Sequence, residues 1–185
     1  MNREKNTENH LEEAVVSRER VFKGDYLCLD RLTVRLPDGS TAVREVAVVR
    51  DAAAVLPLDK DGCVHLVRQH RPAVGRTLTE VPAGLIQPGE SPEDAARREC
   101  EEETGFSPHV LKKLITYAHA EGYSTGFITL FLGTELERTG RRPDPGEFVE
   151  CVTMPFTELL GRIERNEVID SKTILCAVLG QKAVG

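Results

Sequence analysis

Residues 84–106 read GLIQPGESPEDAARRECEEETGF and contain the clearest secondary-structure signal in the chain. Ser91 is a good helix N-cap, and Pro92 suits the first helical turn. Gly105 is a residue with which helices commonly end. Together these signals predict a helix from Ser91 to Thr104.

Two glutamates of this helix are expected to face the protein interior. At about 100° per residue, Glu99 and Glu103 share a face with small residues at 96 and 100, and small residues usually mark the packed side. The opposite face is expected to carry Asp94, Arg97, Arg98 and Glu101. An unpaired interior charge is costly, and a bound metal ion is one way to compensate it. The other interpretation is a solvent-exposed acidic helix, which an isolated Glu-Glu-Glu run favours.

The spacing of residues 84–106 decides between these interpretations. Gly84 lies six residues before Glu90, and Arg98-Glu99 follows eight residues after Glu90. The stretch resembles the signature of the Nudix hydrolase family, G-x5-E-x7-R-E-U-x-E-E-x-G-U, in which U is a bulky aliphatic residue. Every fixed position matches, and Cys100 and Phe106 keep an apolar side chain at two U positions.

The resemblance implies a metal site in this stretch. Glu99 and Glu103 are implied to be the principal ligands of Mg²⁺ or Mn²⁺, with Glu102 a third ligand or close neighbour. The carbonyl group of Ala83 is implied as a backbone ligand. Hard oxygen ligands suit these ions, and two or more such ions can bind a diphosphate and lower the pKa of an attacking water.

Three further residues of the signature are implied to support this site. Gly84 is expected to have a structural role, and Glu90 is expected to support the metal cluster. Arg98 is expected to orient one of the glutamates rather than to touch the substrate.

The sequence before the signature is similar to the branch of ADP-ribose pyrophosphatases and nucleoside-diphosphate-sugar hydrolases. Residues 67–86 read VRQHRPAVGRTLTEVPAGLI and match that branch at Gln69, Arg71, Glu80, Pro82, Ala83 and Gly84. Arg71 is a candidate phosphate clamp because a guanidinium pairs well with phosphate oxygens. The alternative for Arg71 is a surface arginine at the end of a strand.

Other substrate-binding candidates lie outside the signature. Arg44 resembles part of another pair of the branch, and Glu80 is as suited to anchoring a loop as to touching the ligand. Stacking on a nucleobase needs an aromatic ring, and the chain has no Trp, so Phe22 or Tyr26 is the candidate. Plain packing is the alternative for both rings.

The loop at residues 119–126 reads HAEGYSTG and departs from the pattern of the branch. Relatives commonly end this loop with a glutamate that is credited with activating the catalytic water. Gly126 occupies that position here, and Glu121 stands where proline is common. Either Glu121 supplies the carboxylate from a rearranged loop, or a signature glutamate such as Glu102 is the base, or the enzyme is weakened or specialised. Glu102, Glu103 and Glu121 are therefore the catalytic candidates, and a solvated loop residue is the alternative for Glu121.

The rest of the chain predicts an α/β fold. Alternating apolar and polar residues predict hairpins around Pro37-Asp38-Gly39 and around residues 59–62. Further strands are expected at 77–85, 110–117, 127–136 and 148–154, and helices at 155–165 and 171–179. This order predicts a mixed sheet with helices on its faces. The resemblance implies a Nudix-type α/β/α sandwich with an N-terminal antiparallel β-sheet element.

Three segments are expected along the chain. Residues 1–16 are expected to be a disordered tail, residues 17–50 an N-terminal β element, and residues 51–185 the hydrolase domain. In relatives the N-terminal element joins a homodimer and helps build the substrate site. A homodimer is therefore expected here.

The composition argues against several other classes of protein. The net charge is −6, whereas a nucleic-acid binder is more often basic. No run of about 18 apolar residues occurs, so a membrane span is not expected. The five cysteines are scattered without a C-x-x-C pair, which predicts reduced thiols and a cytoplasmic location.

The main functional hypothesis is metal-dependent hydrolysis of the pyrophosphate bond of ADP-ribose or a related NDP-sugar. The products would be a nucleoside monophosphate and a sugar phosphate. One alternative is a Nudix-fold nucleotide-sugar binding or regulatory protein with weak or no turnover, which Gly126 favours. Another is a Nudix hydrolase for a different nucleoside diphosphate derivative, such as NADH or CoA.

Overall fold

The computed structural model describes residues 10–142 and 148–184, and the chain divides into two compact units. Unit 1 contains the chain up to Arg50 together with Ala118–Gly126, and unit 2 contains Asp51–Tyr117 and the chain from Phe127 onward. Residues 1–9 of the expected tail lie outside the described residues, and strand β1 begins at Ala14.

Unit 1 is built on a three-stranded antiparallel sheet in the order β1-β2-β3. Its strands are β1 (Ala14–Lys23), β2 (Cys28–Arg35) and β3 (Thr41–Val48). The predicted hairpin between β2 and β3 is confirmed. Gly39 adopts a φ of 85°, which favours glycine, and the Asp38 carboxylate accepts the N–H of Ser40 at 2.9 Å.

The loop at residues 118–126 is hydrogen-bonded to β3. The N–H of Ala47 donates to the carbonyl of Tyr123 at 2.7 Å, and the carbonyl of Ala47 accepts the N–H of Thr125 at 3.0 Å. The sequence analysis did not assign this loop to the N-terminal sheet, because the two segments are more than 70 residues apart.

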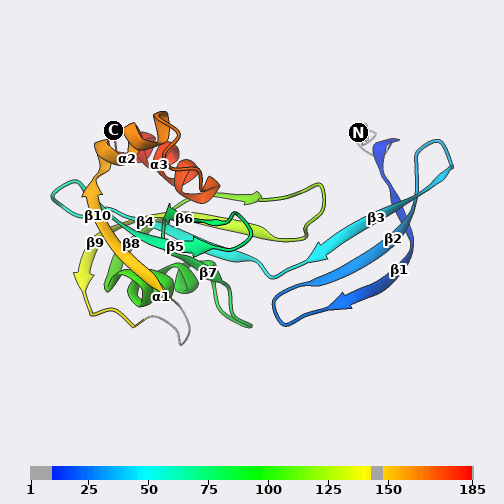
Figure 1. Cartoon of the computed structure of the whole chain (residues 1–185), viewed down its shortest axis with the longest axis horizontal. Coiled ribbons are helices and arrows are strands. Elements are labelled where there is room, and N and C mark those ends of the chain that lie inside the picture. The colour runs from blue at the N-terminus through cyan, green and yellow to red at the C-terminus, as the bar shows by residue number, and fades with distance from the viewer. Residues whose placement is uncertain (1–9, 143–147, 185) are drawn as a thin grey trace, which may run out of the picture. The chain divides into compact units, whose positions relative to one another are not determined.

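Within the described residues, unit 2 contains two sheets and three helices (Figure 1). One sheet has the order β7-β4-β9-β8 and the other β10-β5-β6. The strands are β4 (Ala52–Pro57), β5 (Cys63–Arg71), β6 (Arg76–Glu80), β7 (Ala83–Leu85), β8 (Phe106–Ala118), β9 (Phe127–Arg138) and β10 (Val149–Pro155). The helices are α1 (Pro92–Thr104), α2 (Phe156–Glu164) and α3 (Ser171–Val184). The predicted helices near 155–165 and 171–179 are confirmed, although α3 continues to Val184.

Strand β4 lies at the centre of the layered arrangement. It pairs antiparallel with β7 and parallel with β9, so the sheet is mixed as predicted. Ala53 and Val55 point to one face and pack with α1, whereas Ala54 and Leu56 point to the other face and join the core that includes residues of α2 and α3. Figure 1 shows α1 on one side of these strands and α2 and α3 on the other. The predicted α/β/α sandwich is therefore confirmed.

The predicted hairpin between β4 and β5 forms only as a turn closed by one antiparallel bridge, between Leu58 and Val64. The carboxylate of Asp59 accepts the N–H groups of Asp61 and Cys63, both at 2.9 Å. However, β4 lies between β7 and β9, while β5 lies between β10 and β6 in the other sheet. The reason is the composition of β4, which reads AAAVLP and suits a central strand that is buried on both faces.

No helix in the described part of the chain is long and apolar enough to cross a membrane.

Substitution of Leu56 by alanine should destabilise unit 2 by about 2–5 kcal/mol, because it leaves a cavity beside the most buried strand. Urea unfolding of the variant and the wild type measures this loss. Val178→Ala is the control, since Val178 is an exposed residue of α3 and should cost within about 0.5 kcal/mol. Equal losses for the two variants would show that β4 is not the centre of the core.

Candidate active site

Helix α1 is held so that its glutamates face the sheet. The Ser91 hydroxyl accepts the N–H of Asp94 at 3.1 Å and caps the N-terminus, and Gly105 ends the helix with a φ of 79°. Ala95, Ala96 and Cys100 are fully buried against Ala53, Val55 and Phe131. This packing fixes the rotation of the helix.

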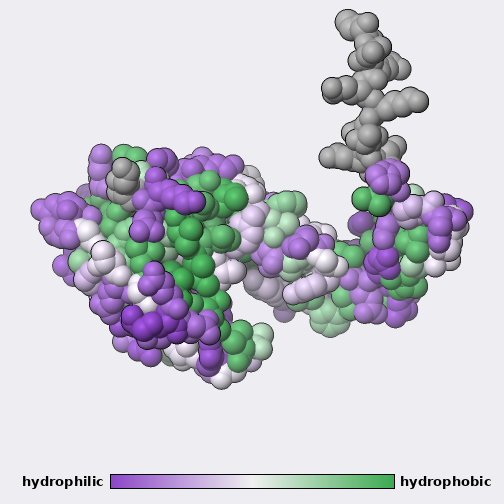
Figure 2. Space-filling model, turned by 90° about the horizontal axis from the view of Figure 1, so that it is seen from above, coloured by the Kyte–Doolittle hydropathy of each residue, from purple (hydrophilic) through white to green (hydrophobic). Residues whose placement is uncertain are grey.

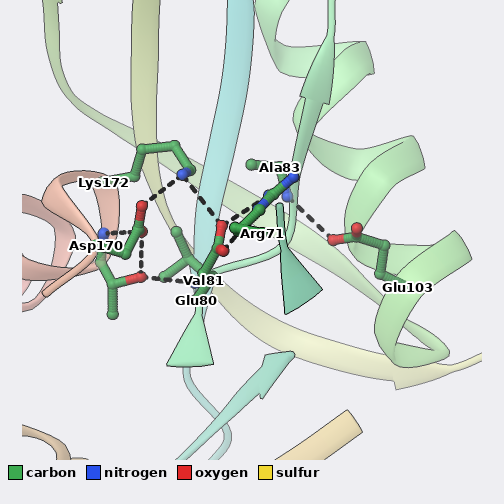
Figure 3. Close-up of polar contacts among 8 residues, drawn as sticks. Arg71, Glu80, Val81, Ala83, Glu103, Asp170 and Lys172 are labelled. Atoms are coloured by element: carbon green, nitrogen blue, oxygen red, sulfur yellow. Dashed lines mark hydrogen bonds and ion pairs between the residues drawn. The ribbon is translucent and has the colours of Figure 1, made fainter. Parts of the chain in front are cut away.

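Glu103 is a buried carboxylate beside the start of β7. Its side chain belongs to a residue that is only 4% exposed, and one of its oxygens accepts the N–H of Ala83 at 3.1 Å. Ala83 is paired with Ala54 of β4, so the sheet fixes its position (Figure 3). The expectation that Glu103 faces the packed side of α1 is confirmed by this burial.

Glu99 lies one helical turn before Glu103 and packs directly on Gly84. A Cβ atom built on Gly84 would overlap the Glu99 carboxylate. Gly84 therefore leaves room for the Glu99 carboxylate, which a side chain at residue 84 would displace. The structure thus brings together Ala83, Gly84, Glu99 and Glu103.

Arg98 joins three carboxylates of the signature. Its guanidinium donates to Glu90 at 2.8 and 3.1 Å, to Glu99 at 2.7 Å and to Glu102 at 3.0 Å. It also donates to the carbonyl of Leu85 at 3.3 Å. The hydrogen bonds from Arg98 lower the pKa of Glu90.

The prediction that Arg98 lies on the face of α1 opposite to Glu99 is wrong for its guanidinium. The Cα position follows the helical wheel, but the long side chain turns back to the carboxylates and is only partly exposed. A helical wheel gives only the direction in which a side chain leaves the helix and takes no account of the length of that side chain.

Within residues 10–142 and 148–184, no three Asp, Glu, His or Cys side chains converge as a ready metal-binding cluster. Glu99 and Glu102 accept from Arg98, and Glu103 accepts from Ala83. A cation at this site would compete with those donors. The candidate ligand atoms nevertheless fit Mg²⁺ or Mn²⁺, because they are all carboxylate or carbonyl oxygens.

Arg71 and Glu80 form a two-point ion pair at the ends of β5 and β6. The Nε and Nη2 groups of Arg71 donate to the two oxygens of Glu80 at 2.7 and 2.8 Å. Glu80 is 1% exposed, whereas the side chain of Arg71 is 40% exposed. Glu80 therefore anchors Arg71, and part of the Arg71 side chain stays at the surface.

Three residues at the start of α3 complete this buried network, and the sequence analysis did not identify them. Lys172 donates to Glu80 at 3.2 Å and to Asp170 at 2.6 Å, and the hydroxyl of Thr173 donates to Asp170 at 2.7 Å (Figure 3). The spacing of Asp170 and Thr173 before an apolar helix is a capping signal that marks this helix start. Nothing in the sequence indicates that Lys172 lies beside Glu80, which is 92 residues away.

Three sequence candidates belong to unit 1. Arg44 forms an ion pair with Glu13 at 2.7 Å, Tyr26 is an exposed residue of the turn between β1 and β2, and Glu121 is exposed in the loop that follows β8. Gly126, in contrast, is buried. A Cβ atom there would lie 2.6 Å from Val49 Cγ2 and 2.8 Å from His119 Cε1, so a glutamate at this position would require both neighbours to move.

The Arg71–Glu80–Lys172 network should make the protein sensitive to acid. Burial alone would raise the pKa of Glu80, but Arg71 and Lys172 outweigh that effect and hold it below its ordinary value of 4.5. A lowered pKa stabilises the fold above pH 4.5, and this contribution is lost as the pH falls through the folded-state pKa. The difference in free energy of unfolding between the wild type and Glu80→Gln should therefore shrink when the pH falls below 4.5.

Urea unfolding at a series of pH values measures this difference. Glu93→Gln, an exposed change in the first turn of α1, serves as the control. A difference between the wild type and Glu80→Gln that does not change with pH would contradict the assignment.

Residues 48–175 match the family model described as NUDIX domain. An ADP-ribose pyrophosphatase of Bacillus subtilis is 36% identical over 165 residues, which cover 88% of this chain and 89% of the relative. A methanol dehydrogenase activator of Bacillus methanolicus is 31% identical over 167 residues, covering 89% and 90%. A solved structure described as an ADP compounds hydrolase superposes with a TM-score of 0.84 at 21% identity and 94% coverage of each chain.

The family model spans β4 to β10, α1 and the network around Glu80, and it includes Glu103 beside Ala83 and Glu99 beside Gly84. The identity and coverage of the two bacterial relatives agree with that match. The chain belongs to the Nudix family.

Proposed function

We propose that the protein is a metal-dependent pyrophosphohydrolase that splits ADP-ribose or a related nucleoside diphosphate sugar. The products are a nucleoside monophosphate and a sugar phosphate. The observation that carries the proposal is the position of Glu103 beside Ala83 and of Glu99 beside Gly84, with Arg98 joining Glu99 to Glu102. The relative named ADP-ribose pyrophosphatase supports the choice of substrate.

Mg²⁺ or Mn²⁺ is the proposed cofactor. Glu99, Glu102 and Glu103 would hold it, together with the carbonyl oxygen of Ala83. When bound, such ions neutralise the charge of the diphosphate and lower the pKa of the attacking water. Arg98 would keep the carboxylates of Glu99 and Glu102 oriented through its hydrogen bonds.

Arg71 is the proposed diphosphate ligand of the protein itself. Glu80 engages the Nε–Nη2 edge of the guanidinium, and the side chain is 40% exposed. A guanidinium held in this way can present its Nη1 side to a phosphate oxygen without a further loss of side-chain freedom.

Unit 1 is proposed to carry the contact surface of a homodimer. Strand β1 is at the edge of its sheet, and large apolar residues on it are exposed, among them Val15, Val21 and Phe22. Figure 2 shows apolar surface on this part of the chain. Exposed edge strands and apolar patches of this kind favour association with another chain. Arg44 and Tyr26 of this unit stay candidates for substrate binding.

A regulatory function is the second candidate. The relative of Bacillus methanolicus is named as an activator of another enzyme. The resemblance to the pyrophosphatase branch also implies a glutamate at the position of Gly126. Under this proposal the protein would bind a nucleotide sugar with little or no turnover.

A release assay separates the two candidates. The protein is incubated with Mg²⁺ and ADP-ribose, ADP-glucose, GDP-mannose, NADH or 8-oxo-dGTP, and a coupled phosphatase reports the monophosphate products. Hydrolysis of a nucleoside diphosphate sugar supports the enzyme, and tight binding without turnover of any of these compounds would overturn it.

Glu103→Gln should lower kcat by about 100-fold or more while the protein stays folded, because it removes a carboxylate proposed to bind the cation. Glu101→Gln is the matched control on the same helix and should keep the wild-type rate. The release assay gives both rates, and circular dichroism reports the fold. A Glu103→Gln variant with the wild-type rate would rule out Glu103 as a metal ligand.

Glu121→Gln tests the identity of the base. If Glu121 activates the water, its loss should lower kcat by about 100-fold or more, with little change in KM. If Glu121 is not the base, Glu121→Gln should turn over at the wild-type rate. Glu102→Gln should lose activity in either case, because Glu102 is also a proposed metal ligand, so steady-state kinetics of Glu121→Gln decide the question.

A further inference from the structure

Four consecutive residues, from Glu80 at the end of β6 to Ala83 at the start of β7, are each tied to another element. Glu80 binds Arg71 and Lys172, and the N–H of Val81 donates to the Thr173 hydroxyl at 2.8 Å. The carbonyl of Pro82 accepts the N–H of Val55 at 3.1 Å, and the N–H of Ala83 donates to Glu103 at 3.1 Å. Residues 80–83, which lead into the signature, are therefore held by contacts with β5, α3, β4 and α1.

The first turn of α3 supplies two of these ties. Asp170 accepts the N–H and the hydroxyl of Thr173 at 2.9 and 2.7 Å, and its other oxygen accepts Lys172 at 2.6 Å. Asp170 thereby orients both side chains that reach the segment at residues 80–81. Thr173 is fully buried and the side chain of Lys172 is only 16% exposed, so neither contact is a loose surface interaction.

Lys172 balances the charge of the network. Glu80 and Asp170 are two buried carboxylates, and Arg71 and Lys172 are the two cations that face them. Without Lys172, Glu80 would keep Arg71 as its cation, but Asp170 would lose its ion pair. The unpaired negative charge of Asp170 would then attract the Arg71 guanidinium. A buried carboxylate needs both charge and hydrogen-bond partners to stay in one orientation.

From this arrangement we infer that Lys172 is a positioning residue for hydrolysis, acting through Glu80 on Arg71. Lys172 donates to Oε2 of Glu80, the oxygen that also accepts from Nη2 of Arg71. Glu80 thus holds the Nε–Nη2 edge of Arg71, and the Nη1 side of Arg71 receives the diphosphate. The inference rests on the proposed function and adds a residue that touches neither the substrate nor the signature. Small shifts of a group that aligns the substrate have large effects on the rate, so the loss of Lys172 should lower the rate of hydrolysis.

A double-mutant cycle tests this assignment. Lys172→Met should lower kcat/KM for the nucleoside diphosphate sugar that the wild type hydrolyses by about 10- to 100-fold, as changes behind a site residue typically do. In the Arg71→Ala background, Lys172→Met should cause little further loss, because the two residues act in series. Lys182→Met, an exposed change near the end of the same helix, should keep the wild-type value.

Nitrogen-15 spectra of the arginine Nε–H groups give a readout that does not depend on turnover. The Arg71 signal, assigned by its loss in Arg71→Ala, should be protected from solvent exchange in the wild type and exchange faster in Lys172→Met. If Lys172→Met does not fold, Lys172→Gln replaces it, since its amide can still donate one hydrogen bond.

The outcomes separate this inference from the proposed function. A wild type that hydrolyses none of the nucleoside diphosphate sugars overturns the proposed function and with it the role of Lys172. An active wild type with an unchanged kcat/KM in Lys172→Met overturns the inference alone. If Lys172→Met lowers kcat/KM as much in the Arg71→Ala background as in the wild type, the inference is also overturned, because independent losses indicate a general structural effect.

Discussion

Close packing of α1 on β4 is the constraint from which the rest of the site follows. The helix presents Ala95, Ala96 and Cys100 to a strand of alanines and valine, and side chains of this size allow the two backbones to come near each other. The same face carries Glu99 and Glu103, so tight packing draws two carboxylates out of water. Their burial has to be compensated: Arg98 donates to Glu99, and the N–H of Ala83 donates to Glu103.

The close approach also explains why a glycine follows Ala83. The Glu99 carboxylate occupies the space that a side chain at residue 84 would need. The start of β7 thus contacts α1 on one side and pairs with β4 on the other. The packing of α1 and the pairing of β7 with β4 therefore bring the carboxylates of Glu99 and Glu103 beside the backbone of residues 83–84.

The second organising feature is the set of ion pairs around Glu80, which connects three elements. Arg71 comes from β5, Glu80 from β6, and Lys172 from α3. Each buried charge is matched by an opposite one, and the exposed part of Arg71 is left at the edge of the network. This arrangement turns a flexible side chain into a fixed one, which is what the recognition of a diphosphate requires.

The sequence by itself determined the helix, its caps and the inward direction of Glu99 and Glu103, because helix signals are local and the periodicity of small residues is visible along 14 positions. It also indicated the family, since the spacing of the glutamates reflects a fixed geometry. Only the tertiary structure decided that β4 and β5 belong to different sheets, that the Arg98 guanidinium contacts Glu90, Glu99 and Glu102 together, and that Lys172 contacts Glu80. Those contacts join residues far apart in the chain or depend on the length of a side chain, and no local pattern encodes either one.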